Sequence, residues 1–378
     1  MKKIFSIIAA IATVGTAMTG SLASCTDMGG DGVDSVLWEG SQNPENTSYR
    51  NPVWEPSLEA GTVFKAASVY VAISSETEWA KGLKYCCPVV TSNDLMSWNF
   101  TAQTAFNYPA PPAEDEEEGE TTATSTIGLR PSWTEARIAN ISADFAKTVS
   151  GANYWMVYQP EGENAIGAAS STSGQGPYTD QGAFITAEKL GVSKIENPFF
   201  VVFSTKFYVC YTTENGSYVQ ELTLRRGQKP TLKGTAKQVA GPEFSDIAIY
   251  RTSSSSYYIF GTVKNGSGTE VRYARATAAT GPYTDKAGND LVNGSNGELL
   301  IEGGDENVNP ENVCRVFADG QGVQYVAYNA TAAGKELMAS NYKRRPLFIS
   351  PMELDEEGWF KGVIVPNTGW TTPRFSLD

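Results

Sequence analysis

The sequence of 378 residues contains no histidine. This absence excludes Ser-His-Asp and Cys-His catalysis and removes the commonest protein ligand of transition metals. Cysteine is scarce, and the spacing of the four cysteines beyond Cys25 matches no zinc pattern. We therefore predict no metal site and no cofactor from these residues. Cys86, Cys87, Cys210 and Cys314 are expected to be buried free thiols, and any acid–base chemistry has to come from carboxylates.

Basic residues are in deficit: 29 Lys and Arg face 42 Asp and Glu, for a net charge of −13. This balance argues against nucleic acid and anionic membrane surfaces as partners, and a neutral polymer such as a polysaccharide fits better. The 18 Tyr, 16 Phe and 8 Trp favour strands with aromatic cores, and aromatic faces also stack on sugar rings. The acidic run 114–118 lies in a proline-rich stretch, 107–126, which we interpret as a solvated insertion rather than a cation site.

A long apolar run occurs only near the N-terminus. It spans residues 4–18, follows Lys2 and Lys3, and precedes Leu22-Ala23-Ser24-Cys25, which resembles the lipobox of bacterial lipoproteins. This resemblance implies a signal peptide over 1–24, lipidation of Cys25 and a membrane anchor, followed by a flexible tether over 25–48. An ordinary signal peptide with an incidental cysteine is the alternative. We expect an outer-membrane lipoprotein that faces the periplasm or the cell surface.

The rest of the chain, 49–378, consists of short β-rich runs separated by Gly, Pro, Asn and Ser, with almost no helical periodicity. Gly176-Pro177-Tyr178-Thr179-Asp180 returns as Gly281-Pro282-Tyr283-Thr284-Asp285, and residues 91–98 hold the same place relative to their strands. Such radial repetition predicts an all-β, five-bladed β-propeller, expected to be monomeric. The blades are predicted near 52–106, 128–187, 195–239, 243–301 and 308–365.

Several fragments, in their order and spacing, resemble glycoside hydrolase family 43. They are Glu55-Pro56-Ser57, Ile195-Glu196-Asn197-Pro198, Val239-Ala240-Gly241-Pro242-Glu243, Asn309-Pro310-Glu311-Asn312 and Asp355-Glu356-Glu357-Gly358-Trp359. The resemblance implies a five-bladed propeller with an inverting mechanism, in which an acid and a base flank the sugar with room for a water.

The catalytic positions that this resemblance implies are altered. Glu55 stands where the family has an Asp as general base, and an ordinary structural carboxylate is the alternative. The residue that tunes the acid falls on Asn197 if Pro198 sets the register, or on Glu196 if Ile195 does. The acid position falls on Ala240, which has no proton to donate.

Two carboxylates beyond Ala240 could supply an acid from a shifted position, namely Glu243 and Asp246. Strand alternation turns the residue three places past Ala240 to the opposite face unless a bulge intervenes. The family's channel histidine falls on Asn312, and the resemblance allows a Ca²⁺ ion in the central channel.

Three aromatic residues are candidate sugar platforms, with blade packing as the alternative: Trp54, Trp133 and Tyr178. Three functions remain open. The chain binds arabinan-like or xylan-like glycans with weak or no hydrolysis, or it is an active arabinosidase or xylosidase with a relocated acid, or it is a structural, adhesin-like surface protein. Whether it is an enzyme depends on the carboxylates at the propeller axis.

Overall fold

The computed structural model describes residues 49–58, 62–106, 126–266, 268–303, 308–318, 324–332, 334–338, 341–366 and 370–371. The predicted signal peptide, Cys25, the tether and nearly all of the acidic insertion lie outside the described residues. Within the described ranges, no helix has the length and apolar character that a membrane crossing requires.

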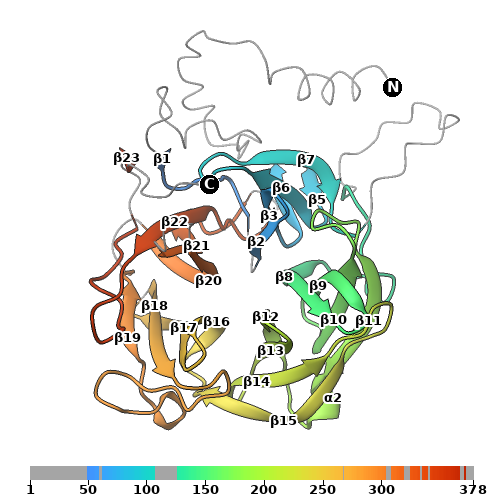
Figure 1. The fold of residues 1–378 in the computed structure, drawn as a ribbon. Helices are drawn as coiled ribbons and strands as arrows, with labels where there is room; N and C mark the ends of the chain where they lie inside the picture. Colours follow the sequence, from blue (N-terminus) through green and yellow to red (C-terminus); the bar gives the residue numbers. More distant parts are fainter. Residues whose placement is uncertain are drawn as a thin grey trace, which may run out of the picture.

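Five antiparallel sheets are arranged around a central axis, which confirms the predicted five-bladed propeller (Figure 1). Blade 1 has strands β2 (Val63–Ala66), β3 (Val69–Ile73), β6 (Pro88–Ser92) and β7 (Asn99–Thr104), and blade 2 has β8 (Ile138–Thr148), β9 (Gly151–Pro160), β10 (Ala165–Ser171) and β11 (Thr179–Thr186). Blade 3 has β12 (Glu196–Phe203), β13 (Lys206–Thr213), β14 (Gly216–Thr223) and β15 (Thr231–Ala240), and blade 4 has β16 (Ser245–Ser253), β17 (Ser256–Asn265), β18 (Gly268–Ala276) and β19 (Glu298–Ile301). Blade 5 has three strands, β20 (Val308–Ala318), β21 (Gln324–Ala332) and β22 (Leu347–Met352). The first strand of each blade lies innermost.

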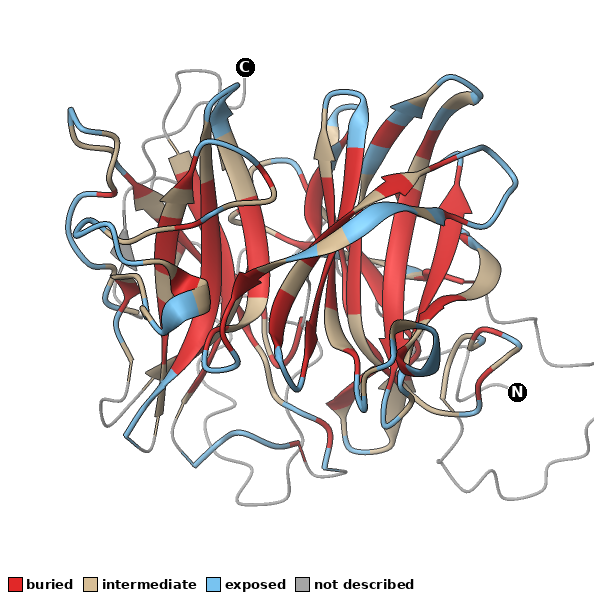
Figure 2. Cartoon of the chain, turned by 90° about the horizontal axis from the view of Figure 1, so that it is seen from below, coloured by how far each residue is buried: buried red, intermediate tan, exposed pale blue. Residues whose placement is uncertain are grey.

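The remaining elements are short. They are the pair β1 (Tyr49–Arg50) and β23 (Trp370–Thr371), the hairpin β4 (Thr77–Ala80) and β5 (Leu83–Tyr85), the helix α2 (Ala187–Leu190) and the 3₁₀ turn η2 (Leu291–Asn293). Figure 2 shows that buried residues occupy the middle of the blade strands and that exposed residues gather in the loops at both ends.

The cores lie where neighbouring blades face each other, and large aromatic side chains fill them. Trp79, Trp155 and Tyr158 are all buried, and the Trp79 ring lies 4.8 Å from that of Phe100 in an edge-on contact. Each such side chain contributes roughly 1.5–3 kcal/mol by leaving water. The aromatic and β-branched residues that predicted strands therefore also hold the blades together.

The N-terminal segment closes the ring by lying along the last blade. The Val53 N–H donates to the Leu347 carbonyl at 2.7 Å, and the Leu347 N–H donates to the Trp54 carbonyl at 3.1 Å. The Asn51 side chain exchanges two hydrogen bonds of 2.9 Å with the Ile349 backbone. Blade 1 was predicted from about residue 52, but its sheet starts at Val63, because residues 49–58 cover the edge of β22 instead.

The repeated Gly-Pro-Tyr-Thr-Asp segments occupy equivalent places, as predicted. Each connects the third and fourth strands of its blade, in blade 2 and in blade 4. The buried Tyr178 hydroxyl donates to the Gly174 carbonyl, and the buried Tyr283 hydroxyl donates to the Ala279 carbonyl, four residues earlier in both cases. The turn at 91–98 makes the same connection in blade 1.

The four described cysteines are free and buried, which confirms that prediction. Burial raises the pKa of the Cys87 and Cys210 thiols, so both stay protonated at neutral pH.

Candidate functional site

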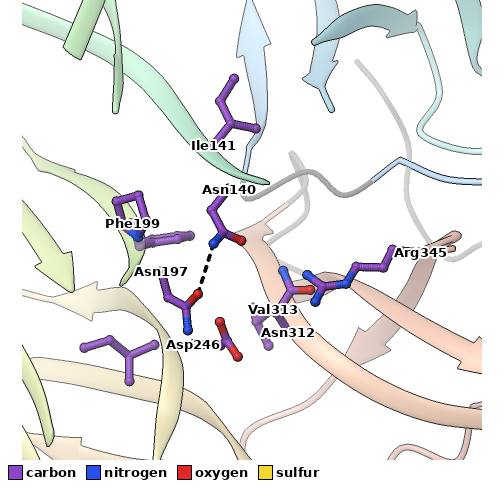
Figure 3. A pocket seen from close by; sticks show the side chains of 10 residues that line it. Asn140, Ile141, Asn197, Phe199, Asp246, Asn312, Val313 and Arg345 are labelled. Carbon is purple, nitrogen blue, oxygen red and sulfur yellow. Dashed lines mark hydrogen bonds between the residues drawn. The ribbon is translucent and has the colours of Figure 1, made fainter. Parts of the chain in front are cut away.

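Four inner strands bring a polar residue to the axis near their first residues. Asn140 of β8, Asn197 of β12, Asp246 of β16 and Asn312 of β20 all line one pocket (Figure 3). A buried apolar residue follows each of them and packs into the blade. The four strands thus repeat one local pattern, with three amides and one carboxylate at equivalent positions.

A register irregularity at each strand explains how these side chains reach the axis. The pairing of β12 shifts between Glu196 and Phe199, and that of β16 shifts between Ser245 and Ala248. Similar shifts occur in β8 and β20. Bulges of this kind re-aim a side chain and are common beside active sites. The bulge in β16 therefore aims the Asp246 side chain at the axis.

The backbone at two of these positions is left-handed. Asn197 has φ 55° and Asp246 has φ 49°. Among residues other than glycine, Asn and Asp tolerate this region best, and such strain gathers at functional sites.

An amide network fixes the blade 2 and blade 3 side of the pocket. The Asn140 Nδ2 donates to Asn197 Oδ1 at 3.1 Å and to Gln159 Oε1 at 3.3 Å (Figure 3). The Asn197 N–H also donates to Gln159 Oε1, at 3.0 Å, and Gln159 Nε2 donates to the Ile195 carbonyl at 2.9 Å. The network holds the Asn197 carbonyl oxygen toward Asn140.

The blade 5 side of the pocket carries charges that are already paired. Arg345 lines the pocket and forms an ion pair with Glu311, whose carboxylate also accepts a hydrogen bond from Thr331. Next to it, Arg344 lies 3.5 Å from Glu55, at the nearest nitrogen and oxygen.

The axial pocket is small, with a volume of about 30 Å³. This volume holds a water molecule or a small ion but not a sugar ring, so a sugar would contact the pocket from its mouth. In the described part of the chain, no group of three or more His, Cys, Asp or Glu could hold a metal ion. Ca²⁺ binding at the axis stays a prediction, in which Asp246 and the amide oxygens would supply the oxygen ligands.

Comparison with known families decides the classification. The model of glycosyl hydrolases family 43 matches residues 121–360. This chain belongs to that family. It is also 25% identical, over 276 residues, to extracellular endo-α-(1→5)-L-arabinanase 2 of Bacillus subtilis. That match covers 66% of this chain and 54% of the relative, so the chain spans about half the length of the curated relative it matches.

Solved structures share the family 43 fold. An α-L-arabinanase of Cellvibrio cellulosa, complexed with arabinohexaose, superposes with a TM-score of 0.57 at 16% identity, over 81% of this chain and 95% of that chain. A family 43 arabinoxylan arabinofuranohydrolase of Bacillus subtilis, in complex with cellotetraose, gives a TM-score of 0.59 at 17% identity, over 85% and 69% of the two chains.

The structure places the predicted family 43 positions in different environments. Asn197 and Asn312 line the axial pocket. Glu196 lies one residue away and pairs with Lys194 at 2.7 Å, with both side chains well exposed. The register that Pro198 sets is therefore the one that reaches the axis.

The predicted acid position, Ala240, lies away from the axial pocket. Ala240 is buried at the end of β15, the last strand of blade 3, where it pairs with Ser217. Glu243 is exposed in the turn before β16. Neither residue lines the axial pocket, whereas Asp246 does.

The predicted sugar platforms serve blade packing. Trp54 is buried with its ring 5.2 Å from that of Trp79, and Tyr178 is buried beneath its turn, so neither offers a ring face to a sugar. Trp133 is half-buried and donates to the Tyr158 hydroxyl at 2.7 Å.

Two residues that line the axial pocket, Asn140 and Arg345, were not predicted. The only sequence signal for Asn140 is a polar residue before an apolar one near a strand start, as at Asn197-Pro198.

Proposed function

We propose that this chain is a glycan-binding member of family 43 that holds arabinan-like or xylan-like polymers over the axial pocket and hydrolyses them weakly or not at all. One observation carries the proposal: three of the four equivalent axial positions, Asn140, Asn197 and Asn312, are amides, and one, Asp246, is a carboxylate. Its similarity to arabinanases and to an arabinofuranohydrolase supports a pentose polymer as ligand.

The chemical reason is that an amide does not act as a general acid or base at neutral pH. Inverting hydrolysis uses two carboxyl groups about 6.5–9.5 Å apart, one as acid and one as base. Amide groups instead donate and accept hydrogen bonds at once, which suits the hydroxyl groups of a sugar. Loss of general acid catalysis typically costs about 10²–10⁴ in rate.

The test measures oligosaccharide binding and the release of reducing sugar from polymers with the same protein. Calorimetry of the chain that follows Cys25 against α-(1→5)-L-arabino-oligosaccharides and xylo-oligosaccharides should show binding to one of them. Reducing-sugar assays with the matching polymers should show no release above a heat-denatured control. Robust release from arabinan or xylan would reject the proposal.

A second candidate is an active glycosidase with a relocated acid, and the bulge that directs Asp246 to the axis favours it. In that case polymer hydrolysis is measurable and Asp246→Asn abolishes it. Glu243→Gln serves as the control, because Glu243 is exposed and lies outside the lining of the pocket.

The place of the protein in the cell is part of the proposal. We propose that Cys25, which lies outside the described residues, carries lipid and anchors the chain to the outer membrane. Cys25→Ser should leave the protein unlipidated, as measured by mass spectrometry of the intact protein. An unchanged lipid mass on the variant would reject this assignment.

A further inference from the structure

A second cavity lies between blades 2 and 3, at the other end of the strands. The end of β10, the start of β11 and the turn between β14 and β15 line it, and its volume is about 630 Å³. Asn140 lies near the start of β8, so β9 and β11 both begin at the end remote from the axial pocket. The volume of this second cavity falls in the usual range of small-molecule sites, about 300–1,000 Å³.

The cavity is lined with hydroxyl and amide groups. Asn153 is only 5% exposed, and its Oδ1 has no hydrogen-bond partner among the described residues. Gln181 Nε2 donates to Ser170 Oγ at 2.8 Å, while its buried Oε1 likewise has no described partner. A buried acceptor without a donor is costly, so a ligand that supplies hydroxyl donors gains two hydrogen bonds here.

Two cations lie at the blade 3 side of the cavity. Arg226 and Lys229 are exposed on the β14–β15 turn, and the Lys229 Nζ donates to the Ala183 carbonyl at 2.8 Å. In the described part of the chain neither residue makes an ion pair. The one lining carboxylate, Asp180, accepts hydrogen bonds from the Tyr158 hydroxyl and the Gly182 N–H.

Blade 4 provides an internal reference for this cavity, because it carries the same turn motif. Ser170 pairs with Thr179 in blade 2, and Arg275 pairs with Thr284 at the equivalent place in blade 4. The Arg275 guanidinium lies 4.8 Å from the Trp359 ring and donates to the Glu357 carbonyl at 2.6 Å. At this place blade 4 thus has an arginine that packs against the segment after β22, whereas blade 2 has the small hydroxyl of Ser170.

We propose that the cavity between blades 2 and 3 binds an oligosaccharide that carries anionic groups, either uronate carboxylates or sulfates. Hydroxyls and amides match the hydroxyl groups of a sugar, and Arg226 and Lys229 match its anionic groups. On a protein of net charge −13, two cations that pair with no carboxylate in the described ranges mark a place where an anion is favoured. This site is separate from the axial pocket and does not depend on the function proposed there.

The test is calorimetry of the chain that follows Cys25 with three trisaccharides: a trigalacturonate, a sulfated trisaccharide and the neutral arabinotriose. At least one anionic trisaccharide should bind, and its affinity should fall when salt screens the charges. The double variant Arg226→Ala/Lys229→Ala should weaken that binding by about tenfold or more. Arg225→Ala, on the same exposed turn but outside the cavity, removes the same charge and should change the affinity less than twofold.

Asn153→Ala tests the contact with the sugar hydroxyls separately from the contact with the charges. This variant should also lower the affinity for the anionic trisaccharide. If Asn153→Ala does not fold, the double variant Arg226→Ala/Lys229→Ala still tests the proposal, because both of its positions are exposed. Which of the two anionic trisaccharides binds identifies the group that is recognised. The proposal is overturned if neither binds, if the double variant keeps full affinity, or if sodium sulfate alone binds as tightly as the anionic trisaccharide. Arabinotriose carries no anionic group, so any heat of binding that it gives should be the same for the double variant as for the unchanged protein.

Discussion

The two sides of the axial pocket carry polar groups of different kinds. On the side of blades 2, 3 and 4, Asn140, Asn197 and Asp246 stand at bulges and face one another. On the side of blade 5, Arg345 is held by Glu311. The carboxylate of Asp246 thus lines the pocket, and the carboxylate of Glu311 forms an ion pair with Arg345 beside it. A count of acidic residues near the axis would therefore overstate the groups available for catalysis.

The largest effect is expected from a second carboxylate on the side of blades 2, 3 and 4. Asn197→Asp should raise turnover of an aryl α-L-arabinofuranoside by about 10² over the wild type. Two carboxylates in one site cannot both ionise easily, so one pKa rises and that group can donate a proton. The Asn197 Oδ1 already accepts from Asn140, and an aspartate keeps that bond. Chromogenic assays of the purified variant measure the gain.

Asn312→Asp is the matched control, because it adds the same charge to the same pocket from blade 5. There the nearby Arg345 keeps the new carboxylate ionised, so no gain is expected. Adding Asp246→Asn to Asn197→Asp should remove the gain. An equal gain from both single variants would mean that charge alone, rather than position, matters.

The second prediction concerns the paired side. Glu311→Gln should lower the free energy of unfolding by about 2 kcal/mol, because it removes the charge that Glu311 sets against Arg345, whose side chain is 13% exposed. Urea denaturation measures the change. Glu221→Gln breaks the exposed pair with Lys233, where the lysine side chain is 61% exposed, and should cost less than about 1 kcal/mol. Equal losses of unfolding free energy in the two variants would show that the Glu311–Arg345 pair contributes no more to stability than an exposed pair.

The sequence predicted the fold better than the site, for a physical reason. Strand patterning and the repeated turns report on blade packing, which many residues determine together. The place of Asp246 at the axis depends on the bulge in β16, which no local pattern in residues 240–246 reveals. The sequence left Asn197 and Glu196 as alternatives, and Asn197 is the one that lines the pocket. Trp54 and Tyr178 illustrate the opposite case, since an aromatic residue gives the same signal whether it is buried or exposed.

The smallest effect is expected at Glu55, which the sequence offered as a general base. Glu55 does not line the axial pocket, and its carboxylate lies 3.5 Å from Arg344 with 23% of its side chain exposed. Glu55→Gln should therefore cost about 1 kcal/mol or less in unfolding free energy. In the Asn197→Asp background, it should leave the gained aryl arabinofuranoside turnover within about twofold, since general base catalysis is worth about 10²–10⁴ and this residue does not supply it. If the gained turnover disappears while the unfolding free energy stays unchanged, Glu55 is the base, and the paired side of the pocket takes part in the chemistry.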